Sequence, residues 1–273
     1  MEQNNQSGKF LIQKIFDKIF EKGNLSSEDQ NAVNSALEKE ILEKPFRVAV
    51  IGQSGVGKST TLNAVFGLKN YTSDIAEGTT DIKEDVFPMR NGFNLSIYDM
   101  PGLNNDVDKD IEYEKLYRKI LPGCDVIVYI INAHSKDFGE DCRILKDIVL
   151  PICNTNHVRE NLILAVNKID TIGESFNPDD PELRWNIFDN EPTEKLKVAI
   201  RRKLSDINDK LIDENLVGAD DSLNPEQVVY YSAIYNYNLK PFVMAITKAG
   251  KRGWIWPATV GLEVVGKHSE AKI

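Results

Sequence analysis

The stretch Phe46-Arg-Val-Ala-Val-Ile-Gly-Gln-Ser-Gly-Val-Gly-Lys-Ser-Thr60 decides the fold of this chain. It is a short apolar run that breaks into the pattern GxxxxGKS, and a segment compatible with a helix follows it. Successive backbone N–H groups of such a glycine loop converge on a phosphate, and the positive end of the helix dipole strengthens the site. Lys58 is expected to reach the β- and γ-phosphates, and the Ser59 hydroxyl to bind Mg²⁺. A glycine-rich turn without a ligand, the alternative, would not need a strand and a helix around it.

A second motif indicates which base the nucleotide carries. Asn167-Lys-Ile-Asp170 directly follows the apolar run 161–166 and is therefore predicted to lie at the end of a strand. The Asp170 carboxylate can accept both the N1–H and the exocyclic N2–H of guanine, whereas adenine presents no such pair of donors. A site that hydrogen-bonds a polar edge can reject the wrong ligand by roughly 10⁴-fold, because a mismatch leaves buried groups unpaired. The four residues alone would also suit a loop cap, and their place in the chain favours guanine.

Two weaker motifs fall in the matching order. Asp99-Met-Pro-Gly102 ends an alternating run, which places Asp99 at a strand end near Mg²⁺ and the Gly102 N–H near the γ-phosphate. Ser232-Ala233-Ile234 follows the apolar run 228–231, and the Ala233 N–H is placed to contact guanine O6. The four motifs in one order are a stronger indication than any one of them.

With these motifs in place, the chain resembles the TRAFAC-class P-loop GTPases, and within them the small stand-alone bacterial members of the Era-like group (the TrmE–Era–EngA branch). The residues that carry the resemblance are GQSGVGKST at 52–60, EGTT at 77–80, DMPG at 99–102, NKID at 167–170 and SAI at 232–234. The resemblance implies a three-layer, Ras-like α/β fold with a mostly parallel central sheet, and GTP or GDP with Mg²⁺ as cofactors. In that family a threonine of the GTT segment binds Mg²⁺, which implicates Thr79 or, preferably, Thr80.

The resemblance also assigns roles to individual positions. Nucleotide contacts are expected from Gly52, Ser54, Gly55, Val56, Gly57, Lys58, Ser59, Thr60, Asp99, Asn167, Lys168, Asp170, Ser232 and Ala233. The expected Mg²⁺ ligands are Ser59, Thr80 and Asp99, and the residues expected to act in catalysis are Lys58, Thr80 and Gly102.

Alternating strand and helix patterns predict a mostly parallel sheet covered on both faces. Strands are expected at 46–52, 83–89, 93–99, 125–131, 161–167 and 227–232, and helices at 57–67, 107–121, 138–150, 191–214 and 236–249. The second strand is charged and contains Pro88, which predicts a place at the sheet edge. Binding sites in such sheets lie at the carboxyl ends of the strands, where all the motifs are predicted to fall.

The chain is expected to comprise a helical N-terminal extension (1–45), a GTPase domain (46–250) and a C-terminal tail (251–273). Segment 8–22 has a broad apolar face opposite several lysines. Such a helix can make peripheral contact with a membrane surface. Amphipathicity more often means burial against protein, so packing onto the domain or a partner subunit is favoured. The long segment 171–190 is expected to be either functional or disordered.

Composition limits the alternatives. A net charge of −9 argues against direct nucleic-acid binding, which needs a basic face. Cys124, Cys142 and Cys153 are odd in number and lack metal-site spacing, so they are interpreted as reduced, buried thiols of a cytoplasmic protein. The sequence contains neither a secretory signal nor an apolar run of about 18 residues.

Hydrolysis is expected to be slow without help. Leu103 follows Gly102 at the place where Ras-type proteins carry a water-orienting Gln. Gly55 occupies the place of an Asn through which some relatives recruit K⁺, which makes K⁺ activation doubtful. Arg90 and Arg118 are only surface candidates for an arginine finger, so a homodimer or an activating protein is the hypothesis. Two functions stay open: a slow, Mg²⁺-dependent GTPase switch, and a GTP-gated interaction or assembly protein, oligomerising or membrane-associated, with little hydrolysis.

Overall fold

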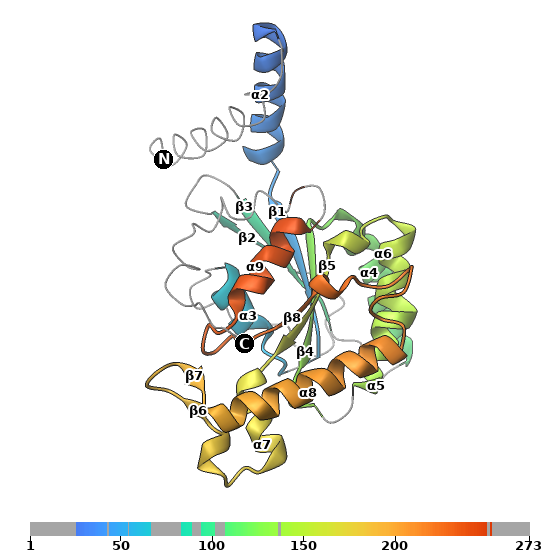
Figure 1. The fold of residues 1–273 in the computed structure, drawn as a ribbon. Coiled ribbons are helices and arrows are strands. Elements are labelled where there is room, and N and C mark those ends of the chain that lie inside the picture. Colours follow the sequence, from blue (N-terminus) through green and yellow to red (C-terminus); the bar gives the residue numbers. More distant parts are fainter. Residues whose placement is uncertain are drawn as a thin grey trace.

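The computed structural model describes residues 26–42, 44–53, 55–66, 83–88, 94–101, 107–135, 138–249 and Arg252. Their centre is a six-stranded sheet in the order β2-β3-β1-β4-β5-β8 (Figure 1). The strands are β1 (Phe46–Ile51), β2 (Lys83–Pro88), β3 (Asn94–Asp99), β4 (Val126–Asn132), β5 (Leu162–Asn167) and β8 (Val228–Tyr230). β2 runs antiparallel to β3, and the other four pairings are parallel.

Each strand agrees with the apolar run that predicts it, to within two residues at either end. The predicted edge position of the second strand is also confirmed. β2 pairs only with β3 among the described strands, and Pro88 at its end has no N–H to donate to a further strand.

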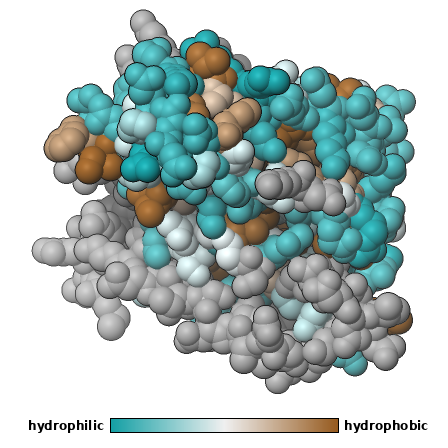
Figure 2. Space-filling view, turned by 90° about the horizontal axis from the view of Figure 1, so that it is seen from below, coloured by the Kyte–Doolittle hydropathy of each residue, from teal (hydrophilic) through white to brown (hydrophobic). Residues whose placement is uncertain are grey.

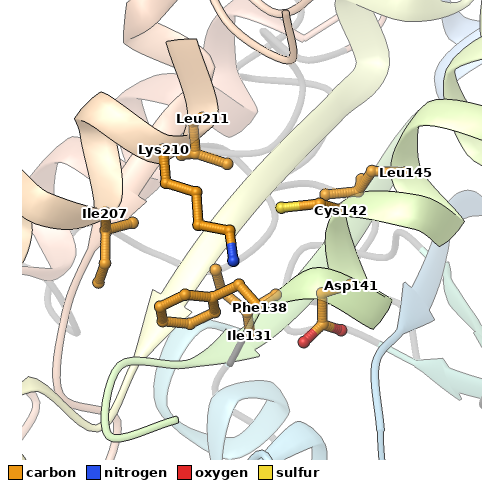
Figure 3. A pocket seen from close by; sticks show the side chains of 8 residues that line it. All are labelled: Ile131, Phe138, Asp141, Cys142, Leu145, Ile207, Lys210 and Leu211. Carbon is orange, nitrogen blue, oxygen red and sulfur yellow. The ribbon is translucent and has the colours of Figure 1, made fainter. Parts of the chain in front are cut away.

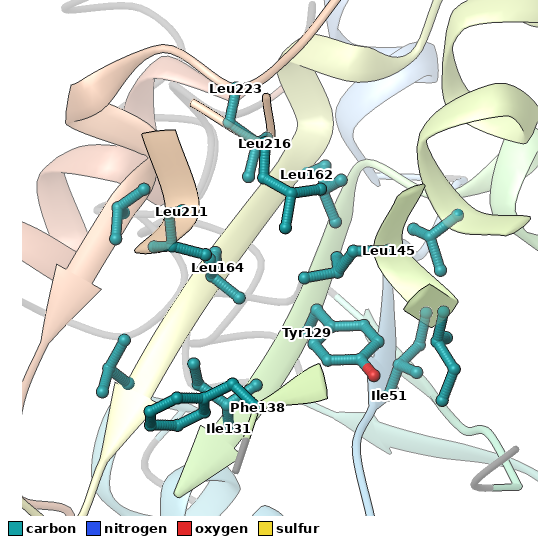
Figure 4. Close-up of a cluster of buried hydrophobic side chains, with 14 of the residues drawn as sticks. Ile51, Tyr129, Ile131, Phe138, Leu145, Leu162, Leu164, Leu211, Leu216 and Leu223 are labelled. Atoms are coloured by element: carbon teal, nitrogen blue, oxygen red, sulfur yellow. The ribbon is translucent and has the colours of Figure 1, made fainter. Parts of the chain in front are cut away.

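Helices cover both faces of the sheet, which confirms the three-layer fold. α3 (Lys58–Phe66) and α9 (Leu239–Lys248) cover one face, and α4 (Val107–Ile120), α5 (Gly139–Ile144), α6 (Leu150–Thr155) and α8 (Glu194–Asp213) cover the other. Each face has its own apolar cluster, because successive strand side chains point to opposite faces. In β4, for example, Val128 packs under α3 and α9, whereas Tyr129 packs on the opposite side. Figure 4 shows part of this second cluster, between the sheet and α8.

The helix expected at 138–150 is longer and contains a wider turn. It runs as α5, a π-helical turn η2 (Leu145–Val149) and α6, so it ends at Thr155. The Leu150 N–H donates to Leu145 O, five residues earlier. Pro151 explains this turn, because its ring clashes with the carbonyl four residues before it and it has no N–H to donate. The wider turn lets the helix continue past the proline.

The segment 171–190 is ordered, which contradicts the disordered alternative. It follows the short helix η4 (Ile169–Thr171) and forms α7 (Ile172–Phe176), η5 (Pro181–Leu183) and a two-stranded hairpin of β6 (Trp185–Asn186) and β7 (Glu191–Pro192). α7 packs closely against η5. A methyl group at Gly173 would lie 1.9 Å from Leu183 O. The remaining short helices are η1 (Leu121–Gly123), η3 (Arg159–Asn161) and η6 (Pro225–Gln227).

Helix α2 (Ser27–Leu42) precedes the sheet and projects away from it (Figure 1). The Ser26 hydroxyl accepts the Asp29 N–H at 3.2 Å and so caps the start of α2. Segment 8–22 and all of 251–273 except Arg252 lie outside the described residues. No helix that the structure describes is long and apolar enough to cross a membrane.

The three cysteines are free and buried, as predicted. Burial raises the pKa of the Cys124 and Cys153 thiols to about 12, so both are neutral at physiological pH.

We expect Gly173→Ala to destabilise the protein by about 1–3 kcal/mol, because the new methyl group has no room against Leu183 O. Thermal unfolding should begin at a lower temperature, and limited proteolysis should cleave the 171–192 region faster. Val198→Ala is the control, because Val198 is 61% exposed on α8. Equal melting temperatures for Gly173→Ala and Val198→Ala would contradict the predicted clash.

Candidate functional site

All the motif residues that the structure describes lie at one end of the sheet, beyond the carboxyl ends of β1, β3, β5 and β8. This is the lower end of the sheet in Figure 1, and Figure 2 views the molecule from that side. Parallel pairing brings the motifs together, because it aligns the ends of strands that lie far apart in the chain. Ser54, Thr79, Thr80, Gly102 and Leu103 lie outside the described residues, so their predicted roles stay predictions.

The glycine loop has the backbone that its sequence predicts. Gly52, Gly55 and Gly57 have φ values of 149°, 76° and 95°, a region that side chains disfavour. Space is also limiting at two of them. A Cβ at Gly52 would lie 2.5 Å from Ile130 O, and one at Gly57 would lie 2.5 Å from Asn167 Nδ2. Only glycine fits at these two positions.

Lys58 closes over the loop. Its ammonium group donates to Gly52 O at 3.0 Å and to Gln53 O at 3.2 Å. Burial lowers the pKa of Lys58, and the nearby Asp99 carboxylate opposes this shift. The half-buried Lys58 ammonium group, enclosed by the backbone of the glycine loop, is a suitable partner for a phosphate anion.

Asp99 and Ser59 supply oxygen atoms beside Lys58. Asp99 ends β3 and is 3% exposed, and Ser59 lies in the first turn of α3, directly after the loop. A hydroxyl and a carboxylate beside a phosphate site are ligands that Mg²⁺ prefers, with water and phosphate oxygens completing its shell. The described residues therefore fit the predicted magnesium ion.

Asn167 joins the glycine loop to both guanine motifs. It is 2% exposed at the end of β5. Its Nδ2 donates to Val56 O at 2.9 Å, and its Oδ1 accepts the Ala233 N–H at 3.0 Å. Lys168 has a left-handed backbone and donates through Nζ to Gly55 O at 2.6 Å. The predicted contact between the Ala233 N–H and guanine O6 would require this donor to be shared with Asn167.

Asp170 presents an unused acceptor. Its Oδ1 is buried and has no hydrogen-bond partner among the described residues. Burial raises the pKa of Asp170, whereas a hydrogen bond from Ser232 lowers it. A buried carboxylate oxygen without a partner is unfavourable, and the N1–H and N2–H of guanine are donors of the kind that would satisfy it. The site therefore fits a guanine base.

Sequence reasoning missed two buried contacts around the site. The hydroxyls of Thr61 and Tyr231 lie 2.7 Å apart and connect α3 to the end of β8. The Asp141 carboxylate accepts the Tyr129 hydroxyl at 2.9 Å and also bonds the Gln53 side chain of the glycine loop. Neither pair has a local signal, because their members come from different elements.

The pocket in Figure 3 is not the nucleotide site. It lies between α5 and α8 and is lined by Ile131, Phe138, Asp141, Cys142, Leu145, Ile207, Lys210 and Leu211. It has room for about one water molecule.

Comparison with known proteins agrees with this geometry. Residues 47–168 match the family described as 50S ribosome-binding GTPase. The tRNA modification GTPase MnmE of Mycoplasmoides gallisepticum is 21% identical over 219 residues, which cover 79% of this chain and 46% of MnmE. GTPase Der of Chlorobium phaeobacteroides is 26% identical over 167 residues, which cover 56% of this chain and 37% of Der. The chain thus spans less than half the length of either relative.

Among solved structures, the bacterial dynamin GTPase LeoA from ETEC aligns with a TM-score of 0.52 at 16% identity, covering 96% of this chain and 46% of LeoA. At this identity the match shows a shared fold alone. The family match covers the glycine loop, β3 and the start of the NKID motif, which the structure brings to one end of the sheet. Residues 47–168 therefore form a P-loop GTPase domain similar to those of MnmE and Der, two members of the TrmE–Era–EngA group.

Proposed function

We propose that this protein is a molecular switch that binds GTP and GDP and hydrolyses GTP slowly with Mg²⁺. The observation that carries the proposal is the Oδ1 atom of Asp170, which is buried and has no hydrogen-bond partner among the described residues. Asn167, three residues before it, bonds the glycine loop, so the candidate sites for base and phosphate lie next to each other. In this proposal residues 46–250 form the working domain, with 1–45 as an extension and 251–273 as a tail.

Each residue has a physical task in the proposed mechanism. The loop amides and Lys58 hold the phosphates and stabilise the charge that develops as water attacks the γ-phosphorus in line. Ser59 and Asp99, with Thr80 as a further candidate, hold Mg²⁺, which supplies charge neutralisation at the phosphate oxygens. Asp170 and Asn167 orient the base, and the Gly102 N–H is proposed to meet the γ-phosphate.

Slow hydrolysis is expected because Leu103 stands at the place where a residue could orient the attacking water. Leu103 has no group that can orient it, so an activating protein or a second copy of the chain is proposed to complete the site. The free, buried cysteines support a cytoplasmic location. The alternative, a GTP-gated assembly protein with little hydrolysis, uses the same residues and differs in turnover.

Asp170→Asn should weaken GDP binding by at least about 100-fold, because the amide offers guanine one acceptor in place of two. Affinity should shift toward xanthosine diphosphate, whose base presents an oxygen where guanine has its amino group. Titration calorimetry with GDP, xanthosine diphosphate and ADP measures this. Asp179→Asn, at an exposed position of the same segment, is the control. Unchanged GDP affinity in Asp170→Asn would refute the guanine assignment.

GDP affinity should also depend on pH through Asp170. The guanine N–H groups need the ionised carboxylate, and burial raises its pKa above the ordinary value of 3.8. Affinity should therefore fall as the pH drops through this raised pKa. GDP dissociation constants measured from about pH 7.5 down to about pH 4 test this, with pyrophosphate as the control for phosphate titration. Parallel curves for the two ligands would contradict the prediction.

Intrinsic hydrolysis should be equally slow in K⁺ and in Na⁺, because Gly55 has no side chain to hold a K⁺ ion. Single-turnover GTP hydrolysis in the two salts, at several protein concentrations, measures this. A rate that rises with protein concentration would support activation by a second copy, and a flat rate would favour a separate activating protein. Stimulation by K⁺ would contradict the prediction, and undetectable turnover in every condition would favour the assembly alternative.

A further inference from the structure

The β6–β7 hairpin contacts the loop that carries the Ser-Ala-Ile motif. The Trp185 ring stacks on Tyr235 with centroids 4.7 Å apart and planes 15° apart, and it meets the Tyr237 ring edge-on at 5.0 Å. Asn190 Nδ2, from the same hairpin, donates to Tyr235 O at 2.9 Å. The hairpin thus contacts both the ring and the backbone carbonyl of Tyr235. The hydrogen bond joins residues that are 45 positions apart in the sequence.

The loop needs such support. It is closed by a single bridge, in which Ser232 and Tyr237 exchange two backbone hydrogen bonds of 3.1 and 3.0 Å. Asn236 and Asn238 have φ values of 51° and 57°, in the left-handed region that asparagine adopts less readily than glycine. Residues other than glycine in this region are kept there by the contacts around them.

The same loop faces the proposed guanine site. Tyr235 lies two residues beyond Ala233, whose N–H bonds Asn167 Oδ1, and its own N–H contacts Ser232 Oγ at 3.4 Å. The Ser232 hydroxyl lies near the Asp170 carboxylate and lowers its pKa. A shift of Tyr235 would therefore move Ala233, which bonds Asn167, and Ser232, which lies beside Asp170.

The hairpin is itself anchored to the domain. Trp185 packs against the apolar cluster under α8. Thr193 caps α8 by accepting the Leu196 N–H at 3.3 Å, and its hydroxyl donates to Glu182 O. The hairpin is therefore connected to the body of the fold through the start of α8, a helix of 20 residues.

We propose that the hairpin 185–192 is a brace for guanine recognition, in which Trp185 is the main positioning residue and Asn190 the second. This inference rests on the proposed function, since it deepens the role of the same site. Trp185 touches neither Asp170 nor Asn167 in this assignment and acts through Tyr235. Its effect is on the base end of the nucleotide and leaves the phosphate end unchanged.

Trp185→Ala should raise the GDP dissociation constant by about 10-fold or more, mainly through faster release, because the loop loses its aromatic support. Pyrophosphate, which has no base, should bind as it does to the wild type. Trp185→Phe should stay within about threefold of wild type, since Trp185 Nε1 has no hydrogen-bond partner in the described part of the chain and only the ring is needed. Phe188→Ala is the matched control, because Phe188 is 93% exposed at the tip of the same hairpin.

Asn190→Gly keeps the proposal testable if Trp185→Ala does not fold. Asn190 has a φ of 54°, which glycine adopts freely, so this variant removes the side-chain hydrogen bond to Tyr235 without straining the folded backbone. It should raise the GDP dissociation constant by about fivefold and leave pyrophosphate binding unchanged.

Stopped-flow release of a fluorescent GDP derivative and calorimetry with GDP and pyrophosphate distinguish the outcomes. Wild-type GDP affinity in both Trp185→Ala and Asn190→Gly would overturn the brace, as would equal losses of GDP and pyrophosphate binding in folded protein. If Asp170→Asn also binds GDP normally, the proposed function itself fails. If only Asp170→Asn loses GDP, the function stands and the brace alone is wrong.

Discussion

The buried side-chain amide of Asn167 is the interaction on which the candidate site depends. It donates to the glycine loop at Val56 O and accepts the Ala233 N–H, so one group holds the ends of three strands together. Its position also explains the loop sequence, because Gly57 has room for no side chain beside Asn167 Nδ2. Loss of this amide would leave a buried carbonyl and a buried N–H without partners, at a cost of about 1–3 kcal/mol for each.

Two apolar layers hold this arrangement in place. The β4 and β5 side chains alternate between the cluster under α3 and α9 and the cluster under α4, α5, α6 and α8. Asp99, Asn167 and Ser232 are buried polar residues at or just beyond the carboxyl ends of β3, β5 and β8. The inner strands β4 and β5 are otherwise apolar on both faces, as is usual for parallel sheets. The packed strands thus fix the relative positions of the functional groups, which the loops alone could not do.

The phosphate end and the base end of the candidate site each contain a charged group whose pKa is shifted by burial, in opposite directions. Burial lowers the pKa of Lys58 at the phosphate end and raises that of Asp170 at the base end. Each shift disfavours the charged form that a guanine nucleotide needs, and the phosphates and the guanine N–H groups restore it. Nucleotide binding therefore stabilises the charged forms of Lys58 and Asp170, which burial alone disfavours. The Asn167 bonds keep these positions at a constant separation.

The sequence by itself determined the strands, most helix bounds, the edge position of β2, the glycine loop and the location of the NKID motif. These features depend on residue types within a few positions of one another, such as the apolar run before Gly52 or the absence of an N–H at Pro88. Only the tertiary structure decided the strand order, the Thr61–Tyr231 bond and the stacking of Trp185 on Tyr235. Most of these contacts join residues tens to more than a hundred positions apart, and such partners are chosen by how the packed elements meet in space rather than by any local pattern.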